Sequence, residues 1–186
     1  MSSSKLVVLW RVTEVCDLPC PFCAYSRELR RPRQSVGPER VLAFGKVLKE
    51  YTEATGREVL VSWLGGEPLL WKPIFEVSQI FRREFGLQVS ITTNGTRLND
   101  DTVRQALLAN FAEVTISLDG MGADHDTCRQ TAGLYARVEA GVRRLVAERP
   151  GQAPHLRVNT ILMRGNLYQF ESLCRTVAQW GVESLT

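Results

Sequence analysis

Leu6-Val7-Val8-Leu9-Trp10-Arg11-Val12 is followed, after three residues, by the loop Cys16-Asp17-Leu18-Pro19-Cys20-Pro21-Phe22-Cys23. The first stretch is apolar and rich in β-branched residues, which predicts a strand. In the loop, three and then two residues separate the cysteines, so one short segment can direct three thiolates at one centre. Thiolates are soft ligands that favour zinc, copper(I) or iron–sulfur clusters over hard cations.

The cysteine loop supplies three ligands and no obvious fourth. A closed structural zinc site would need a further Cys or His. The next candidates, His125 and Cys128, lie more than a hundred residues along the chain from Cys23. These residues allow three interpretations. The cysteines could be part of a zinc site, a chance group of buried cysteines, or the ligands of an iron–sulfur cluster in which one iron is free to bind another ligand.

Composition indicates one soluble globular domain that spans residues 1–186. Hydrophobic residues make up 44% of the chain and charged residues 23%, which is ordinary for such a domain. The net charge of +3 gives no strong attraction to polyanions. A basic group follows the cysteine loop; its members are Arg27, Arg30, Arg31 and Arg33. A solvated loop is the favoured interpretation, and a phosphate or nucleic-acid contact is the alternative, which no interleaved aromatic residues support.

The sequence predicts a cytoplasmic protein. Its apolar N-terminal run is too short to cross a bilayer, and the first residues, Met1 to Lys5, do not resemble a secretory signal. The odd number of cysteines, five, is poorly suited to a full disulfide framework. Cys128 and Cys174 stand apart from the loop, and we read both as ordinary cysteines.

Strand and helix patterns alternate along the chain. The expected strands are 6–12, 59–64, 89–93, 114–118 and 156–162, and a sixth begins at Val182. Expected helices begin at Pro38, near Ile74, at Asn99 or Asp100, near Leu134 and near Phe170. The nearly apolar run 59–64 is typical of a strand buried on both faces. We expect a polar loop through His125 and Arg129.

Alternation of this kind indicates an α/β fold with a parallel sheet and outer helices. Two layouts compete, an open doubly wound sheet and a curved, barrel-like sheet. A dinucleotide-binding fold is disfavoured, because no Gly-x-Gly-x-x-Gly follows the first strand.

Polar motifs follow each expected strand at its carboxyl end, where sites are built in such sheets. We therefore expect these motifs to face one cavity. They are the cysteine loop after the first strand, Gly65-Gly66-Glu67-Pro68 after the second, Thr93-Asn94-Gly95 after the third, Ser117 and Asp119 at the fourth, and Asn159 in the fifth.

The Cys-x-x-x-Cys-x-x-Cys spacing, with an aromatic residue before the last cysteine, resembles the signature of the radical S-adenosylmethionine (SAM) family. The resemblance implies that Cys16, Cys20 and Cys23 hold a 4Fe–4S cluster. The amino and carboxylate groups of SAM would then chelate the fourth iron. Phe22 matches the aromatic residue whose neighbourhood meets the adenine.

Two further motifs resemble the family's SAM contacts. Gly65-Gly66-Glu67-Pro68 resembles the GGEP motif that binds the SAM amino group. His125-Asp126-x-x-Arg129 resembles the stretch whose arginine meets the SAM carboxylate, and Gln130 replaces the glycine that usually follows. An arginine fork suits a carboxylate because it can bind both oxygens. A surface position for Arg129 is the competing interpretation.

The remaining cofactor candidates come from the third, fourth and fifth strands. Ser117 resembles the serine of the family's Ser-x-Asp-Gly stretch, which also contains Asp119. Asn159 resembles the residue near the ribose. Asn94 either contacts the ligand or makes the turn.

The resemblance covers Leu6 to Thr186 and implies a partial (β/α)6 TIM-type barrel that is cut off at the start of its sixth strand. It implies reductive cleavage of SAM to methionine and a 5′-deoxyadenosyl radical, which abstracts hydrogen from a substrate. An external one-electron donor of the flavodoxin or ferredoxin type would be needed. The best matches are peptide- and protein-modifying members such as sulfatase maturases, so a peptide or protein side chain is the expected substrate.

Those members carry a C-terminal cysteine-rich extension that is absent from this sequence. We therefore expect the chain to be a fragment or a natural remnant, or to be completed by a partner. The alternative function is a zinc- or iron–sulfur-binding module for structure, sensing or electron transfer, without SAM chemistry. The sequence does not name the substrate or say whether SAM is consumed or regenerated.

Overall fold

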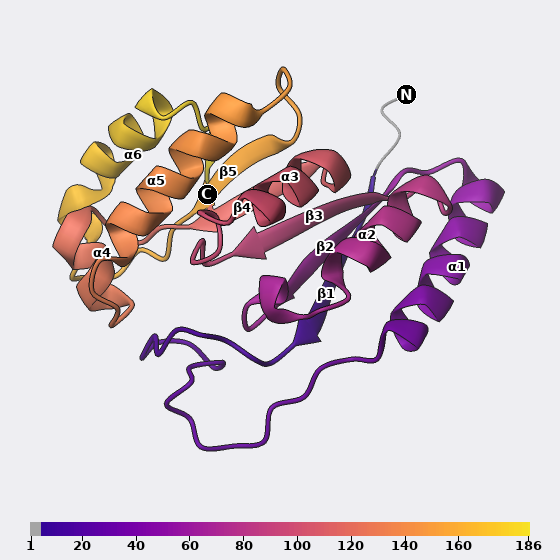
Figure 1. The fold of residues 1–186 in the computed structure, drawn as a ribbon, viewed down its shortest axis with the longest axis horizontal. Helices are drawn as coiled ribbons and strands as arrows, with labels where there is room; N and C mark the ends of the chain where they lie inside the picture. The colour runs from indigo at the N-terminus through magenta and orange to yellow at the C-terminus, as the bar shows by residue number, and fades with distance from the viewer. Residues whose placement is uncertain (1–4) are drawn as a thin grey trace.

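The computed structural model describes residues 5–186, which form one six-stranded parallel sheet with helices packed along one face (Figure 1). The strands are β1 (Leu6–Thr13), β2 (Val59–Gly65), β3 (Gln88–Thr93), β4 (Glu113–Ser117), β5 (His155–Asn159) and β6 (Ser184–Leu185). The α-helices are α1 (Pro38–Thr55), α2 (Ile74–Arg83), α3 (Asp101–Asn110), α4 (Gly122–Cys128), α5 (Leu134–Glu148) and α6 (Phe170–Gln179). Two short 3₁₀ turns, Pro68–Leu70 and Leu167–Gln169, complete the order.

The strands lie side by side in chain order, and every neighbouring pair is parallel. β1 and β6 are the two edges, so the sheet is curved but not closed. This confirms the expected α/β class and the partial-barrel layout, and it excludes the doubly wound alternative.

Local sequence signals begin and end several helices as expected. Pro38 occupies the first turn of α1, and Gly56 ends that helix in the left-handed conformation at φ 67°. Asp100, one of the two predicted caps, accepts hydrogen bonds from the amides of Thr102 and Val103 at the start of α3.

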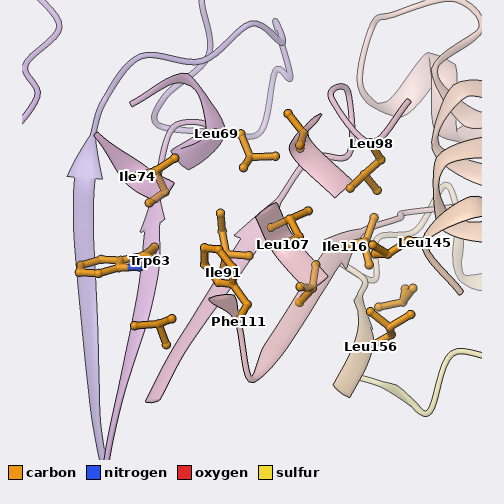
Figure 2. Close-up of a cluster of buried hydrophobic side chains, with 14 of the residues drawn as sticks. Trp63, Leu69, Ile74, Ile91, Leu98, Leu107, Phe111, Ile116, Leu145 and Leu156 are labelled. Carbon is orange, nitrogen blue, oxygen red and sulfur yellow. The ribbon is translucent and has the colours of Figure 1, made fainter. Parts of the chain in front are cut away.

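The apolar core lies between the sheet and the helices (Figure 2). Trp63, Ile91, Ile116 and Leu156 project from β2, β3, β4 and β5 into this layer and are fully buried. Each such side chain stabilises the fold by about 1.5–3 kcal/mol relative to an exposed position. This layer fixes the sheet, and the sheet positions the loops at its carboxyl end.

The other face of the sheet is not covered within residues 5–186. Along β1, Val7 and Leu9 are 50% and 69% exposed, and in β2 the side chains of Ser62 and Leu64 are only partly buried. The expectation that 59–64 is buried on both faces is therefore wrong. Polar and apolar residues alternate along β3, β4 and β5. The face of the sheet that the helices do not cover is therefore too polar to form a second apolar core.

Helix α4 occupies part of the stretch expected to be a polar loop, and that expectation is corrected here. Its seven residues lack an apolar stripe, so no helical period marks them. The helix is held instead by the buried side chain of His125, and it ends where the Arg129 amide donates to the carbonyl of His125.

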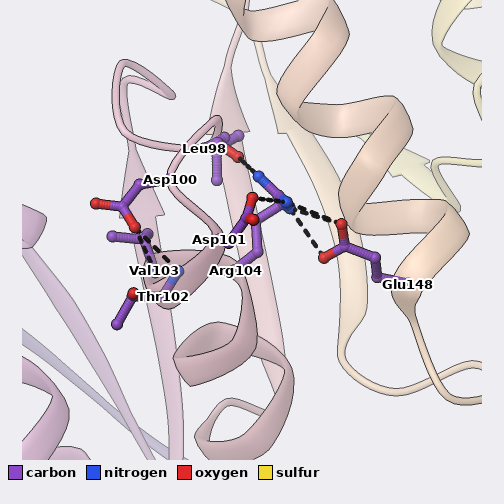
Figure 3. A network of polar contacts seen from close by, with 7 residues as sticks. All are labelled: Leu98, Asp100, Asp101, Thr102, Val103, Arg104 and Glu148. Atoms are coloured by element: carbon purple, nitrogen blue, oxygen red, sulfur yellow. Dashed lines mark hydrogen bonds and ion pairs between the residues drawn. The ribbon is translucent and has the colours of Figure 1, made fainter.

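On the helical side, Arg104 links α3 to α5 (Figure 3). Its guanidinium donates to both carboxylate oxygens of Glu148, at 2.9 and 3.1 Å from Nε, and to the Leu98 carbonyl at 2.9 Å from Nη1. Asp101 takes a further bond from Nη2. Every nitrogen of this buried group has a protein partner.

No helix within residues 5–186 combines the length and apolar character that a membrane crossing requires. Residues 1–4, on which the expectation about a secretory signal partly rests, lie outside the described part of the chain.

Candidate functional site

A cavity of about 430 Å³ lies at the carboxyl ends of the strands. Its walls come from the cysteine loop, the turns after β2 and β3, the ends of β4 and β5, and Arg129 beyond α4. Ten of its residues were predicted from the sequence: Cys16, Cys20, Phe22, Cys23, Gly65, Gly66, Asn94, Ser117, Arg129 and Asn159. The structure thus brings together residues that are up to 143 positions apart (159 − 16).

The cysteine loop leaves β1 and runs past the carboxyl end of the sheet before α1 begins (Figure 1). Consecutive backbone hydrogen bonds turn it: the Cys23 amide donates to the Cys20 carbonyl, and the Ser26 amide to the Cys23 carbonyl. The three thiols are free and line the same cavity. Within residues 5–186, however, no three His, Cys, Asp or Glu side chains stand together as a group able to hold a metal ion.

Burial raises the pKa of the Cys16 thiol to about 11, and it also raises the pKa of Cys20. Both thiols therefore favour their protonated form unless a nearby cation offsets the loss of water. A bound metal does so, because metal ligation deprotonates a thiol.

Gly65 and Gly66 let the turn after β2 touch the start of the cysteine loop. A Cβ at Gly65 would stand 2.1 Å from the Thr13 carbonyl oxygen, and one at Gly66 would stand 2.2 Å from that of Val15. Gly65 also adopts a φ of 137°, which side chains rarely allow. We expected these glycines to make room for a ligand, and the structure shows that they make room for the backbone at the end of β1 and the start of the cysteine loop.

Glu67 does not line the cavity, although the sequence placed it among the cofactor contacts. Its fully buried carboxylate accepts hydrogen bonds from Thr93 Oγ1 at 2.8 Å, the Asn94 amide at 2.7 Å and the Leu69 amide at 3.1 Å. Burial raises the pKa of Glu67 to about 7, and these hydrogen bonds oppose the shift. Glu67 therefore holds the turn after β3 against the turn after β2.

Pro68 is also buried, at the start of the 3₁₀ turn Pro68–Leu70, and it does not line the cavity. Asn94 makes the turn, which is one of the two roles left open by the sequence, and it also lines the cavity. Its Oδ1 accepts from the Thr96 amide at 3.0 Å, which closes the turn.

Arg129 is buried and paired with Asp119, which closes β4. Arg129 Nε and Nη2 each lie 2.8 Å from Asp119 Oδ2, and the two side chains are 8% and 0% exposed. The surface interpretation of Arg129 is therefore wrong. The edge of its fork that faces Asp119 is already taken, so a ligand carboxylate would meet the remaining nitrogen, Nη1, which has no hydrogen-bond partner among residues 5–186.

Asp119 does not line the cavity and instead supports it. Its Oδ1 accepts from the Ile161 amide at 2.9 Å, and its carbonyl accepts from Asn166 Nδ2 at 2.7 Å. Its amide donates to His125 Nδ1 at 3.1 Å. This residue ties the end of β4 to α4 and to the segment after β5.

His125 is held neutral. Burial, together with the nearby charge of Arg129, lowers its pKa from 6.5 to about 4. Because Nδ1 accepts from the Asp119 amide, the proton of the neutral ring is on Nε2, which is buried without a hydrogen-bond partner among the described residues. The ring packs edge-on against Tyr135.

Ser117 and Asn159 are register partners on adjacent strands and face the cavity together. Several lining residues lie outside the motifs expected to face the cavity: Arg11, Tyr25, Leu64, Thr92 and Ile161. Arg11 could have been predicted from the sequence. It is a polar residue near the carboxyl end of β1, where such sites are built, and it lies on the same face of the strand as Leu9.

The donor chemistry fits an iron–sulfur cluster with a polar ligand beside it. Three thiols, which are soft donors, share one cavity with an arginine, an asparagine and a serine that suit the carboxylate and hydroxyl groups of a small molecule. Among residues 5–186, no fourth cysteine and no histidine lines the cavity.

Comparison with known proteins gives consistent results. A model of the radical SAM superfamily matches residues 10–176. An AdoMet-dependent heme synthase from Methanosarcina barkeri is 27% identical over 168 residues, which is 90% of this chain and 45% of that protein. A serine-type anaerobic sulfatase-maturating enzyme from Bacteroides thetaiotaomicron is 29% identical over 133 residues, 67% of this chain and 31% of that protein.

Among solved structures, Streptococcus suis SuiB bound to S-adenosylmethionine shares the fold with a TM-score of 0.75 at 19% sequence identity. The likeness covers 98% of this chain and 40% of SuiB. SuiB has also been solved with its precursor peptide SuiA, and that structure matches with a TM-score of 0.74. The chain spans less than half the length of each of these proteins.

Proposed function

This chain belongs to the radical SAM superfamily, and from that premise we propose that it forms the core of an enzyme that cleaves SAM reductively to abstract hydrogen from a substrate. The superfamily uses a 4Fe–4S cluster together with SAM. One observation carries the proposal: three cysteines and seven further residues predicted to contact SAM line a single cavity. A chance group of buried cysteines does not explain that convergence.

Cys16, Cys20 and Cys23 would hold the cluster through their thiolates. When bound, the cluster supplies the electron that splits the sulfonium bond of SAM. The protein binds, orients and shields the reactants, because the cofactors carry the difficult chemistry. An external donor of the flavodoxin or ferredoxin type would deliver the electron, and a cytoplasmic location would keep the thiols reduced.

The other walls of the cavity would position SAM. Arg129 would meet the carboxylate through Nη1, since Asp119 holds the opposite edge of its fork. Ser117 and Asn159 would bind polar atoms nearer the ribose, and the backbone around Gly65 and Gly66 would face the amino group. Phe22, which is 38% exposed, would lie beside the adenine.

A peptide or protein side chain is the substrate class we propose. SuiB has been solved with a precursor peptide, and another relative matures sulfatases. A tetrapyrrole is the second candidate, because a heme synthase matches over 90% of the chain. Stimulation of SAM cleavage by a precursor peptide or by a porphyrin would separate the two.

Anaerobic reconstitution with iron and sulfide, followed by dithionite and SAM, tests the activity. We expect a broad visible cluster absorbance and formation of 5′-deoxyadenosine. Cys20→Ala should abolish both, since it removes one of three ligands. Cys174→Ala, on α6 and outside the cavity, is the matched control and should leave both intact.

Uptake of zinc with no cluster absorbance, and SAM left intact under dithionite, would remove the enzyme proposal. That result would support the alternative of a metal-binding module.

A further inference from the structure

Asp17, between the first two cysteines, joins the cysteine loop to the turn after β3. Its Oδ1 accepts a hydrogen bond from Asn94 Nδ2 at 2.7 Å, and its Oδ2 accepts from Thr96 Oγ1 at 2.7 Å. Both oxygens of the carboxylate are thus engaged by residues nearly eighty positions away in the chain. A carboxylate bound at both oxygens fixes orientation as well as position.

The same asparagine reaches a proposed cluster ligand. Asn94 Nδ2 lies 3.8 Å from Cys16 Sγ, and Asp17 Oδ1 lies 4.0 Å from that sulfur. The Asn94 backbone is held from the other side, since its amide donates to Glu67 Oε2 at 2.7 Å. The amide group therefore sits between a fixed turn and the sulfur.

The cysteine loop is joined to the sheet at both ends. Backbone bonds from Gly66 and Glu67 hold its start at the carbonyls of Thr13 and Val15, and the chain rejoins the end of β1 at residues 34–36. Between these ends, Leu18 and Cys20 pack into the apolar core. Asp17 makes the side-chain attachment at the first cysteine.

We propose that Asp17 is a positioning residue that docks the cysteine loop onto Asn94 and Thr96, and that Asn94 donates to Cys16 Sγ and thereby sets the reduction potential of the centre. This rests on the proposed function, because the potential belongs to the cluster. A hydrogen bond to a ligand sulfur stabilises the added electron and raises the potential. The docking itself is a property of the protein without the cluster.

Three variants separate the two parts of the proposal. Asp17→Ala removes both acceptors. Asp17→Asn keeps one acceptor for Asn94 Nδ2, and its own amide can donate to Thr96 Oγ1. Asn94→Ala removes the N–H beside Cys16 Sγ and leaves the contact between Asp17 and Thr96 Oγ1 in place. Net charge is equal to that of the natural chain, and the Asp17 carboxylate stays beside the sulfur.

Docking is measured on the cluster-free chain by hydrogen exchange of the segment 16–27. We expect faster exchange in Asp17→Ala, near-normal exchange in Asp17→Asn, and an intermediate rate in Asn94→Ala, which loses one of the two contacts of Asp17. Exchange in Asp17→Ala equal to the natural chain would overturn the docking role. If Asp17→Asn exchanged as fast as Asp17→Ala, the paired contact would be wrong.

The potential is measured by redox titration of the reconstituted chains. We expect iron retention in Asn94→Ala to match the natural chain, with a more negative midpoint potential. An unchanged or more positive potential would overturn the role of Asn94. A natural chain that takes up no cluster would remove the proposed function and the claim about potential, while the exchange result would still decide the docking.

Discussion

Two buried arginines, Arg104 and Arg129, differ in the partners that surround them. Arg104, between α3 and α5, has protein partners for all its side-chain nitrogens. The side chains of its two carboxylate partners, Glu148 and Asp101, are 39% and 78% exposed. Arg129, at the cavity, has one carboxylate partner, Asp119, which is 0% exposed. Both arginines have low exposure, so burial alone does not distinguish them.

The difference lies in what would remain if each arginine were removed. Around Arg104 the orphaned carboxylates could return to water, whereas Asp119 could not. Arg129 also keeps a nitrogen for a ligand, while Arg104 has none to offer. The saturated network on the helical side indicates a structural role for Arg104, and for Arg129, at the strand ends, we propose a binding role.

Arg129→Gln should have the largest effect. It leaves Asp119 buried without its cation, so we expect the free energy of unfolding to fall by about 3–5 kcal/mol. SAM affinity of the reconstituted chain should fall at least about tenfold, since one charge-assisted hydrogen bond is lost. Chemical denaturation and calorimetric titration measure the two quantities.

Asp119→Asn/Arg129→Gln sharpens this test. Neutralising Asp119 should restore part of the stability and none of the SAM affinity. Recovery of both would contradict a direct contact between Arg129 and SAM.

Glu67 and His125 should have opposite effects on the pH dependence of stability. The pKa of Glu67 rises from 4.5 to about 7 on folding. Its contribution to the free energy of unfolding is therefore complete below pH 4.5 and is lost as the pH rises to about 7. The pKa of His125 falls from 6.5 to about 4, so its contribution is complete above pH 6.5 and is lost as the pH falls to about 4.

The two slopes oppose each other between pH 4.5 and 6.5. In Glu67→Gln the free energy of unfolding should rise with pH in this window, by up to about 1.4 kcal/mol per pH unit. In His125→Asn, which keeps an acceptor for the Asp119 amide, it should fall with pH. Denaturant titrations of the cluster-free chain measure both, and equal slopes in the two variants would refute these assignments.

Arg104→Gln should have a moderate effect, confined to stability. We expect a loss of about 1–2 kcal/mol, because the Leu98 carbonyl loses its donor while Glu148 and Asp101 are rehydrated. SAM affinity should equal that of the natural chain. A drop in affinity as large as that of Arg129→Gln would erase the distinction between the two arginines.

Glu171→Gln should have the smallest effect. The ion pair between Arg175 and Glu171 on α6 joins side chains that are 73% and 78% exposed. Exposed pairs of this spacing contribute less than about 0.5 kcal/mol and are screened by salt. A larger loss by denaturation would show that α6 contributes more than a solvated surface.

The sequence predicted the sheet because each strand carries its own apolar, β-branched run and each strand ends in a polar motif. It did not predict α4, because the stretch Gly122–Cys128 has no apolar period and depends on the bond from the Asp119 amide to His125. A contact of that kind forms only after β4 and α4 are in place.

Most residues of the candidate site could be predicted from the sequence. Which of them line the cavity and which support it from behind could not. Glu67 stands beside two glycines like a ligand contact, yet its partners Thr93 and Asn94 come from the next strand. Asp17 carried no signal beyond its place between two cysteines, since Asn94 and Thr96 are its partners only in the folded chain. Pairings between distant turns decide which polar groups face the cavity.

The central claim is that Cys16, Cys20 and Cys23 hold a cluster beside which SAM binds in the cavity containing Arg129. Electron paramagnetic resonance of the reconstituted, dithionite-reduced chain tests this claim directly, with and without SAM. We expect SAM to change the cluster signal in the natural chain, which requires the two to be in contact. A cluster signal that SAM at saturating concentration leaves unchanged would contradict the account.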